Sequence, residues 1–166
     1  MALTSLIIDY KSIWPTLFDQ EAERLRPIFD DAIVDLHHVG STAVVGMSAK
    51  PEIDVLVVVV ETDGLDRWTR ALAILGYIRG KDLETGHHFF RRDVDGIRTH
   101  KLHICQIGHS QVSRMLEIRD HLRINREDRK AYQDLKLRLE RANRNGIAEY
   151  LDGKAPFLDD LYRKIQ

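Results

Sequence analysis

The segment from Ile53 to Val60 constrains the fold more than any other part of the chain. It is an almost unbroken run of apolar, mostly β-branched side chains. β-branched residues favour extended backbone, and a strand without polar alternation is covered on both faces. The run is far shorter than the roughly 18 apolar residues that a membrane span requires. We therefore expect a central strand of a sheet with helices packed on it.

Helical and extended patterns alternate around this strand. Residues 33–39 predict a short strand, and the spacing of apolar residues over 65–75 predicts a helix that Gly76 ends. A further helix is expected to begin at Trp14, with a proline in its first turn, and to falter near Pro27. This β-helix-β order predicts an α+β fold, a short mixed α/β sheet with packed helices.

The dipeptide Asp95-Gly96 lies between two extended segments and predicts a hairpin with a two-residue turn. Counting outward from that turn places His88 opposite His103. The same face would then carry four cationic or titratable side chains: His88, Arg92, Lys101 and His103. Such a surface suits an anion or a metal ion, but it is also what the solvent face of an ordinary hairpin looks like. A register slip of one residue would send each side chain to the opposite face.

From Ser110 onward the chain predicts helices. One of them starts at Asn125, whose side chain can cap it, and a last short helix is expected over 156–165. We expect residues 1–109 to form the α/β core and residues 110–166 to form a helical region packed on it, as a single structural unit.

Composition excludes some classes of function. Lys and Arg number 25 against 26 Asp and Glu, for a net charge of −1. No global field favours nucleic acid or an anionic membrane, so neither is expected as a partner. The single cysteine, Cys105, and the absence of a visible secretory signal lead us to expect a cytoplasmic protein. Nothing in the sequence indicates the oligomeric state or an organic cofactor.

Two short motifs could carry chemistry. Gly40-Ser41-Thr42 follows the first predicted strand, where a glycine lets the backbone approach a ligand and a hydroxyl can contact phosphate oxygens. Glu52 and Asp54 are two residues apart on a strand, so they project to the same side and could share a hard cation. The alternatives are an ordinary turn and a solvated glutamate. Asp54 precedes a buried run and needs a partner, either a cation or hydrogen bonds.

Several segments, in this order along the chain, resemble the GrpB family of small bacterial proteins. They are WP (14–15), HVGSTAV (38–44), AKPEID (49–54), FFR (89–91), RTHKLHI (98–104), RDHLR (119–123) and GK (153–154). The Gly-Ser pair followed by the two acids is similar to the signature of the DNA polymerase β-type nucleotidyltransferase superfamily, to which the GrpB family belongs. The resemblance implies a nucleotidyltransferase-like core.

The same resemblance implies a metal site, and the chain departs from its pattern. Enzymes of that superfamily use two carboxylates on one strand and a third on a neighbouring strand. The third position falls on His103, whose imidazole prefers softer ions than Mg²⁺. In GrpB proteins the position of Glu52 is usually hydrophobic. The expected ligands of a divalent metal, Mg²⁺ or Mn²⁺, are Asp54, Glu52 and His103.

Two functional hypotheses follow. In the first, the protein is an enzyme that transfers a nucleotidyl group from a nucleoside triphosphate to a small acceptor, with Asp54, Glu52 and His103 as the catalytic, metal-holding residues. Phosphate or nucleotide binding is then expected at Gly40, Ser41, Thr42, Lys50, His88, Arg92 and Lys101. In the second, the protein is an inactive module that binds a phosphorylated or anionic small molecule or a protein partner. A weaker alternative treats the histidine face as a transition-metal site. Lys154, after Gly153, could reach back toward a ligand.

Overall fold

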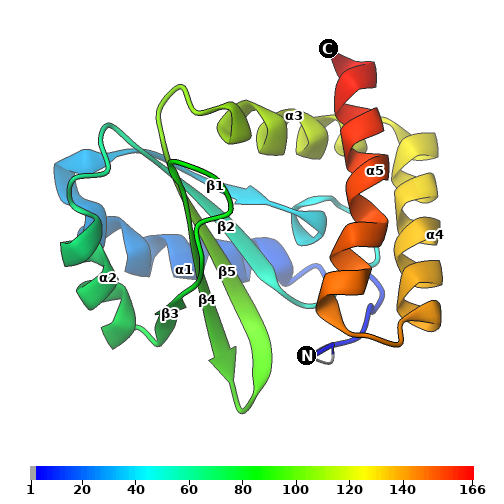
Figure 1. Ribbon diagram of the computed structural model, residues 1–166, viewed down its shortest axis with the longest axis horizontal. Helices are drawn as coiled ribbons and strands as arrows, with labels where there is room; N and C mark the ends of the chain where they lie inside the picture. The colour runs from blue at the N-terminus through cyan, green and yellow to red at the C-terminus, as the bar shows by residue number, and fades with distance from the viewer. Residues whose placement is uncertain (1–2) are drawn as a thin grey trace.

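Five strands form one mixed sheet in the order β1-β2-β5-β4-β3 (Figure 1). The computed structural model describes residues 3–166. Strand β2 runs parallel to β5, the middle strand, and antiparallel to β1, and β4 runs antiparallel to both β5 and β3. The strands are Ile33–Val39 (β1), Ile53–Val59 (β2), Tyr77–Arg79 (β3), His87–Val94 (β4) and Ile97–Gln106 (β5). This confirms the predicted mixed α/β architecture.

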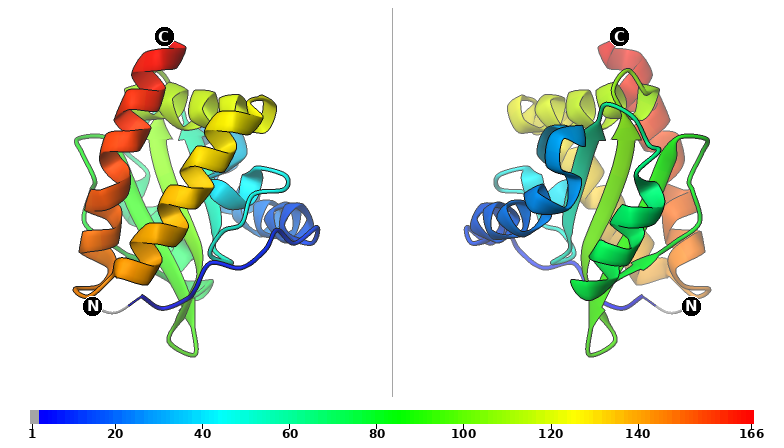
Figure 2. Two further views of the ribbon diagram at one scale, coloured as in Figure 1. Left: turned by 90° about the vertical axis from the view of Figure 1, so that its right-hand side faces the viewer. Right: turned by 90° about the vertical axis from the view of Figure 1, so that its left-hand side faces the viewer.

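Helices cover both faces of the sheet, which is why β2 is apolar along nearly its whole length. The helices are α1 (Trp14–Phe29), α2 (Leu65–Ile74), α3 (Ser110–Ile124), α4 (Arg126–Ala142) and α5 (Ile147–Ile165), with 3-10 turns η1 (Asp30–Ala32) and η2 (Ser41–Ala43). Figure 2 shows α1 and α2 on one side of the sheet and the α3–α5 group on the other. No helix within residues 3–166 is long and apolar enough to cross a bilayer.

The two faces have separate apolar cores. On one face, α1 and α2 bury Phe29 and Trp68 against the sheet. On the other, Met115 of α3 packs against a cluster that includes Val39 and Cys105. Burial raises the pKa of the Cys105 thiol to about 12, so this cysteine is an inert core residue. The division between residues 109 and 110 into core and helical region stays a prediction.

The last helix is longer than its predicted bounds of 156–165. It begins at Ile147, after Gly146 with a φ of 91°, and Pro156 lies inside it. A proline inside a helix removes one backbone hydrogen bond. The apolar face of α5 packs against α3 and α4, with Leu161 buried there, and this packing offsets the loss. The predicted cap of α4 is confirmed, because the Asn125 side chain accepts a hydrogen bond from the backbone N–H of Asp128.

The predicted hairpin turn is confirmed, but its register is wrong beyond the first two pairs. Asp95 and Gly96 have φ values of 52° and 78°, as a two-residue turn of this kind requires. The ladder then shifts, because Arg92 pairs with His100 while the next residue, Asp93, pairs with Arg98. This β-bulge adds one residue to β5.

The bulge decides which side chains share a face. Phe89, and not His88, lies opposite His103. Lys101 and His103 therefore face the side covered by α3–α5, whereas His88 and Arg92 face the other side of the sheet. The four-residue surface expected on one face of the hairpin does not form.

Candidate functional site

The loop after β1 is held against β2 by a glycine. Gly40 has a φ of 72° and a ψ of −173°, a combination that is essentially confined to glycine. A Cβ at this position would lie 2.6 Å from the Asp54 Oδ2 atom. Only glycine therefore lets the η2 loop approach the Asp54 carboxylate so closely. The motif that begins at Gly40 therefore lies directly against Asp54.

A pocket of about 300 Å³ opens beside this contact, between the sheet and the three C-terminal helices. Eight of the ten expected site residues line it: Gly40, Ser41, Thr42, Lys50, Glu52, Asp54, Lys101 and His103. The fold thus brings together expected site residues from the η2 loop, from the segment that leads into β2, and from β2 and β5.

Lys101 connects the carboxylate of Glu52, which immediately precedes β2, with that of Asp54 in β2. Its Nζ atom lies 2.6 Å from Glu52 Oε2 and 3.7 Å from Asp54 Oδ1. The second oxygen of Glu52 accepts a hydrogen bond of 2.9 Å from the Ser5 hydroxyl. Both oxygens of Glu52 are therefore engaged by groups of the chain itself.

Asp54 is ionised despite its burial. Burial alone would raise the pKa of this carboxyl, but Lys101 and His103 outweigh it and lower the pKa to about 2. The His103 Nε2 atom lies 3.7 Å from Asp54 Oδ1, and its Nδ1 atom lies 2.8 Å from His87 Nε2. Only one proton can occupy the contact between the two imidazoles, so their tautomers are linked. Burial, with the adjacent His103, lowers the pKa of His87 to about 4.

These residues do not fit the expected divalent metal. Within residues 3–166, no cluster of three or more His, Cys, Asp or Glu side chains is arranged to hold a metal ion. The ammonium group of Lys101 takes the position between the two carboxylates that a bridging cation would need. The third carboxylate of the superfamily pattern is an imidazole, at His103, which supplies no negative charge.

Two lysines from the C-terminal helices reach the same pocket. The Lys136 Nζ atom, from α4, lies 3.1 Å from Ser41 Oγ and 2.7 Å from the carbonyl oxygen of Ser48. Lys154, from α5, also lines the pocket. Across the part of the chain that the structure describes, no carboxylate oxygen lies within 4.0 Å of either Nζ atom. A cation withdrawn from water without a carboxylate partner is costly; Lys136 is buried and Lys154 is half-buried, so both are candidates to hold an anion.

The electrostatics of the two amines reflect this lack of counter-charge. Burial lowers the pKa of Lys136 to about 7, with further lowering by Lys154 and Lys101. Burial and Lys101 also lower the pKa of Lys154 to about 8. The ring of Tyr150 lies under two of the cations, with its centroid 4.9 Å from Lys154 Nζ and 4.2 Å from Lys50 Nζ. A ring face attracts cations without neutralising them.

The rest of the pocket wall is apolar. Met115, Ile118 and Leu122 contribute from α3, and Leu151 and Leu158 contribute from α5. The pocket therefore has a cationic end at the η2 loop and an apolar wall between the helices. Such a cavity suits a ligand with an anionic group and a less polar body.

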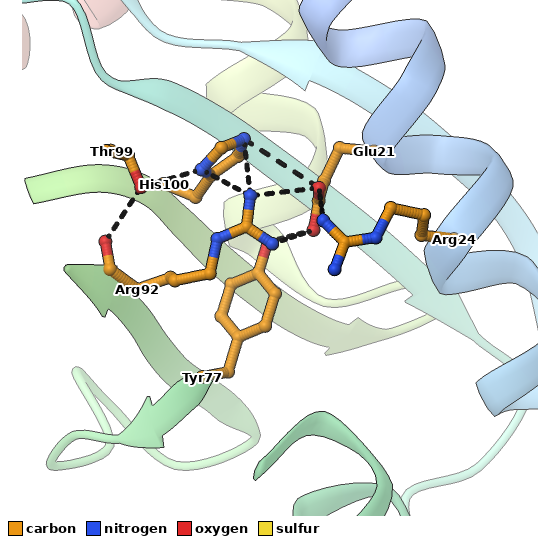
Figure 3. Close-up of polar contacts among 6 residues, drawn as sticks. All are labelled: Glu21, Arg24, Tyr77, Arg92, Thr99 and His100. Atoms are coloured by element: carbon orange, nitrogen blue, oxygen red, sulfur yellow. Dashed lines mark hydrogen bonds and ion pairs between the residues drawn. The ribbon is translucent and has the colours of Figure 1, made fainter. Parts of the chain in front are cut away.

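Two of the expected phosphate-binding residues are elsewhere. His88 Nδ1 lies 3.0 Å from Asp82 Oδ2. Arg92 donates hydrogen bonds to both carboxylate oxygens of Glu21, at 3.0 and 3.1 Å, and contacts His100 (Figure 3). This second cluster joins α1 to the sheet on the face away from the pocket. The bulge in β5 is the physical reason that these two side chains do not join the other expected site residues.

The sequence did carry a signal for Lys136 that our reading missed. Tyr132, Leu135 and Leu139 form the apolar stripe of α4, and Lys136 lies on the same stripe at helical spacing. Burying a lysine on the apolar face of an amphipathic helix is costly, so its presence there indicates a specific partner or a function. No comparable signal marks Tyr150, whose role depends on where α5 packs.

The sequence and the fold resemble those of known proteins. A family model described as GrpB protein matches residues 5–164. A UPF0157 protein of Halalkalibacterium halodurans is 34% identical over 161 residues, which is 95% of this chain and 80% of that protein. The crystal structure of the conserved protein GrpB from Enterococcus faecalis superposes with a TM-score of 0.89 at 30% identity, covering 96% of each chain.

The fold is also that of a nucleotidyltransferase. The Cid1 poly(U) polymerase bound to MgATP superposes with a TM-score of 0.56 at 11% identity, over 89% of this chain and 50% of the polymerase. At that identity the likeness concerns the fold alone. The chain has a nucleotidyltransferase-like fold, and it belongs to the GrpB family.

Proposed function

We propose that the protein binds a phosphorylated small molecule or nucleotide in this pocket, and that binding needs no divalent metal. The phosphate groups contact the Ser41 hydroxyl and N–H groups of the Lys136 and Lys154 amines. The observation that carries the proposal is that two lysines, the buried Lys136 and the half-buried Lys154, have no carboxylate partner among the described residues and line the pocket beside the η2 loop. An anionic ligand supplies the missing counter-charge.

The balance of charge in the pocket supports an anion. Two carboxylates line it, and Lys101 already pairs with both. Arg114 and Arg119 also line it but pair with Asp159 and Asp120, which leaves Lys50, Lys136 and Lys154 as the cationic excess. Ligands with two or more negative charges, such as a diphosphate or triphosphate group, match this excess better than a single carboxylate does.

Metal-dependent nucleotidyl transfer is the second candidate function. It is favoured by the fold and by the ionised Asp54 at the pocket wall. It requires Lys101 to leave the carboxylates so that a cation can replace it, with His103 as a further ligand. The proposed binding function requires no such rearrangement, and we prefer it for that reason.

Calorimetric titration tests the proposal. We expect pyrophosphate and ATP to bind in a buffer that contains EDTA, and we expect Lys154→Met to weaken both by about ten- to a hundredfold, the worth of a hydrogen bond to a charged group. Lys164→Met is the matched control, because Lys164 lies on the same helix but is exposed and pairs with Asp128. Binding that appears only with Mg²⁺ or Mn²⁺, or that Lys154→Met leaves unchanged, would contradict the proposal.

A further inference from the structure

The contact between Ser41 and Lys136 has the geometry of a nucleophile and its base. Ser41 Oγ lies 3.1 Å from Lys136 Nζ, within the range over which a proton can pass between them. Ser41 is half-buried and lines the pocket, whereas Lys136 is buried behind it with 2% of its surface exposed. A ligand in the pocket can therefore reach the hydroxyl, while the amine is shielded from bulk water.

The second contact of Lys136 fixes the orientation of its amine. The Nζ atom donates a hydrogen bond of 2.7 Å to the Ser48 carbonyl oxygen. A neutral amine has two N–H groups and one lone pair. With one N–H directed at Ser48, the lone pair can accept the Ser41 hydroxyl proton. The loop between β1 and β2 supplies both partners and holds the pair together.

The charges around Lys136 favour the neutral amine. Lys101 of β5 and Lys154 of α5 oppose its protonation, while Asp54 of β2 and Glu140 of α4 favour it. Burial is the largest influence, and the net effect lowers the pKa of Lys136 to about 7. A large share of the amine is unprotonated at neutral pH, as a general base must be.

The surroundings of Ser41 indicate the class of ligand. Val44, Leu122 and Tyr132 form one apolar cluster beside the η2 loop. Lys154 and Lys50 lie at the cationic end of the same pocket. A ligand that places a phosphate on the lysines and an apolar acyl group along the helices would bring its carbonyl carbon to Ser41.

We propose that Ser41 is a nucleophile that accepts an acyl group from an acyl phosphate, with Lys136 as its general base. The Ser41 oxygen forms a bond to the carbonyl carbon, and the bond between that carbon and the bridging phosphate oxygen breaks. The electron pair leaves with phosphate. The serine proton passes to Lys136 and then to the departing phosphate, and water later hydrolyses the ester. The phosphate-binding part of this inference rests on the proposed function.

Acylation by benzoyl phosphate tests the inference directly. We expect mass spectrometry of the treated full-length protein to locate one benzoyl ester on Ser41, labile to hydroxylamine, and none on Ser41→Ala. Its rate of formation rises with pH through about 7, following the Lys136 amine. Lys136→Met slows it by a hundredfold or more, the usual worth of a general base. Lys130→Met, on the exposed face of the same helix, leaves the rate unchanged.

Three results would overturn the inference: benzoyl amides on lysines without an ester on Ser41, an equal rate in Lys136→Met, or a rate independent of pH. If Lys136→Met does not fold, the pH profile of the wild-type protein and the Ser41→Ala result still decide. Pyrophosphate binding in EDTA without acylation of Ser41 would refute the nucleophile and leave the proposed function standing. Absence of pyrophosphate binding would refute the proposed function itself.

Discussion

The Lys101 Nζ atom lies 2.6 Å from Glu52 Oε2, so the chain itself supplies the cation that the carboxylates of Glu52 and Asp54 require. The ammonium group comes from β5, the strand that runs parallel to β2, and it also faces Asp54 at 3.7 Å. A side chain thus neutralises the position at which a metal was expected. Metal-dependent transfer requires this contact between Lys101 and the carboxylates to break, whereas the proposed binding function leaves it intact.

Removing that cation should destabilise the protein and expose a metal site. Lys101→Met leaves Glu52 and Asp54 buried near each other without a counter-charge, and we expect a loss of about 3 kcal/mol in the free energy of unfolding. Urea unfolding measures the loss. In the same variant, Mn²⁺ should raise the melting temperature, because it can now occupy the space between the carboxylates.

Arg91→Met provides the matched control for this experiment. Arg91 lies directly opposite Lys101 on β4, so its loss removes a neighbouring cation on the same face without unpairing the acids. We expect little change in stability and no effect of Mn²⁺. A melting temperature of Lys101→Met that does not respond to Mn²⁺ would show that the carboxylates cannot hold a metal even when freed.

The approach of the η2 loop to β2 can be tested at Gly40. In Gly40→Ala the new Cβ would meet Asp54 Oδ2 at 2.6 Å, in addition to the backbone strain at a φ of 72°. We expect a loss of about 3 kcal/mol in stability and weaker phosphate binding. Gly46→Ala isolates the strain, because Gly46 has a φ of 80° and no atom within 4 Å of its Cβ position. It should lose only about 1–2 kcal/mol. Equal losses in the two variants would refute the steric contact.

The Glu21 cluster should stabilise the protein without affecting the pocket. Burial alone would raise the pKa of Glu21, but the Tyr77 hydroxyl and Arg92 lower it below the usual value. Arg92→Met leaves Glu21 buried with a weaker partner set, and we expect a loss of about 3 kcal/mol in stability. Phosphate affinity, measured by calorimetry, should stay unchanged because the cluster lies on the opposite face of the sheet from the pocket. A large loss of phosphate affinity in Arg92→Met would show that Arg92 contributes to the binding site.

Acid should weaken the fold through three buried histidines. Burial lowers the pKa values of His38, His87 and His100 to about 4 in the folded protein, against about 6.5 when exposed. Unfolding below pH 6.5 therefore takes up protons, so the free energy of unfolding falls as the pH falls from about 6.5 toward 4. We expect each histidine to contribute about 1–2 kcal/mol of this loss by pH 5.

Urea unfolding at pH 7 and pH 5 measures the effect. The fall in stability between the two pH values should be smaller in His38→Gln than in the wild-type protein, since glutamine does not titrate. If stability is the same at both pH values in the wild-type protein, these histidines are not held neutral by the fold.

The sequence patterns correctly predicted those structural features that depend on interactions between residues close in sequence. The apolar run of β2, the turn at Asp95 and Gly96 and the cap at Asn125 each depend on residues close in sequence, and all three are confirmed. The bulge in β5 is different. Its extra residue, Thr99, donates a hydrogen bond to the Arg92 carbonyl oxygen, and nothing in the local pattern indicates that this pairing prevails.

The sequence predicted those residues of the candidate site that lie next to the end of a buried strand. Ser41 and Asp54 were found because each adjoins a strand end, where side chains gather. Lys136 belongs to a helix whose position depends on packing among α3, α4 and α5. Its place beside Ser41 is a long-range contact, and only the folded structure brings the two together.

A crystal structure of the protein grown with a nucleoside triphosphate and Mn²⁺ tests the central claim most directly. Anomalous diffraction locates the manganese, and the electron density locates the phosphates. We predict phosphate density against Ser41, Lys136 and Lys154, with Lys101 still paired to Glu52 and no manganese between the carboxylates of Glu52 and Asp54. A manganese ion bound by Asp54 and Glu52 with Lys101 displaced, or phosphates bound away from these lysines, would contradict the account.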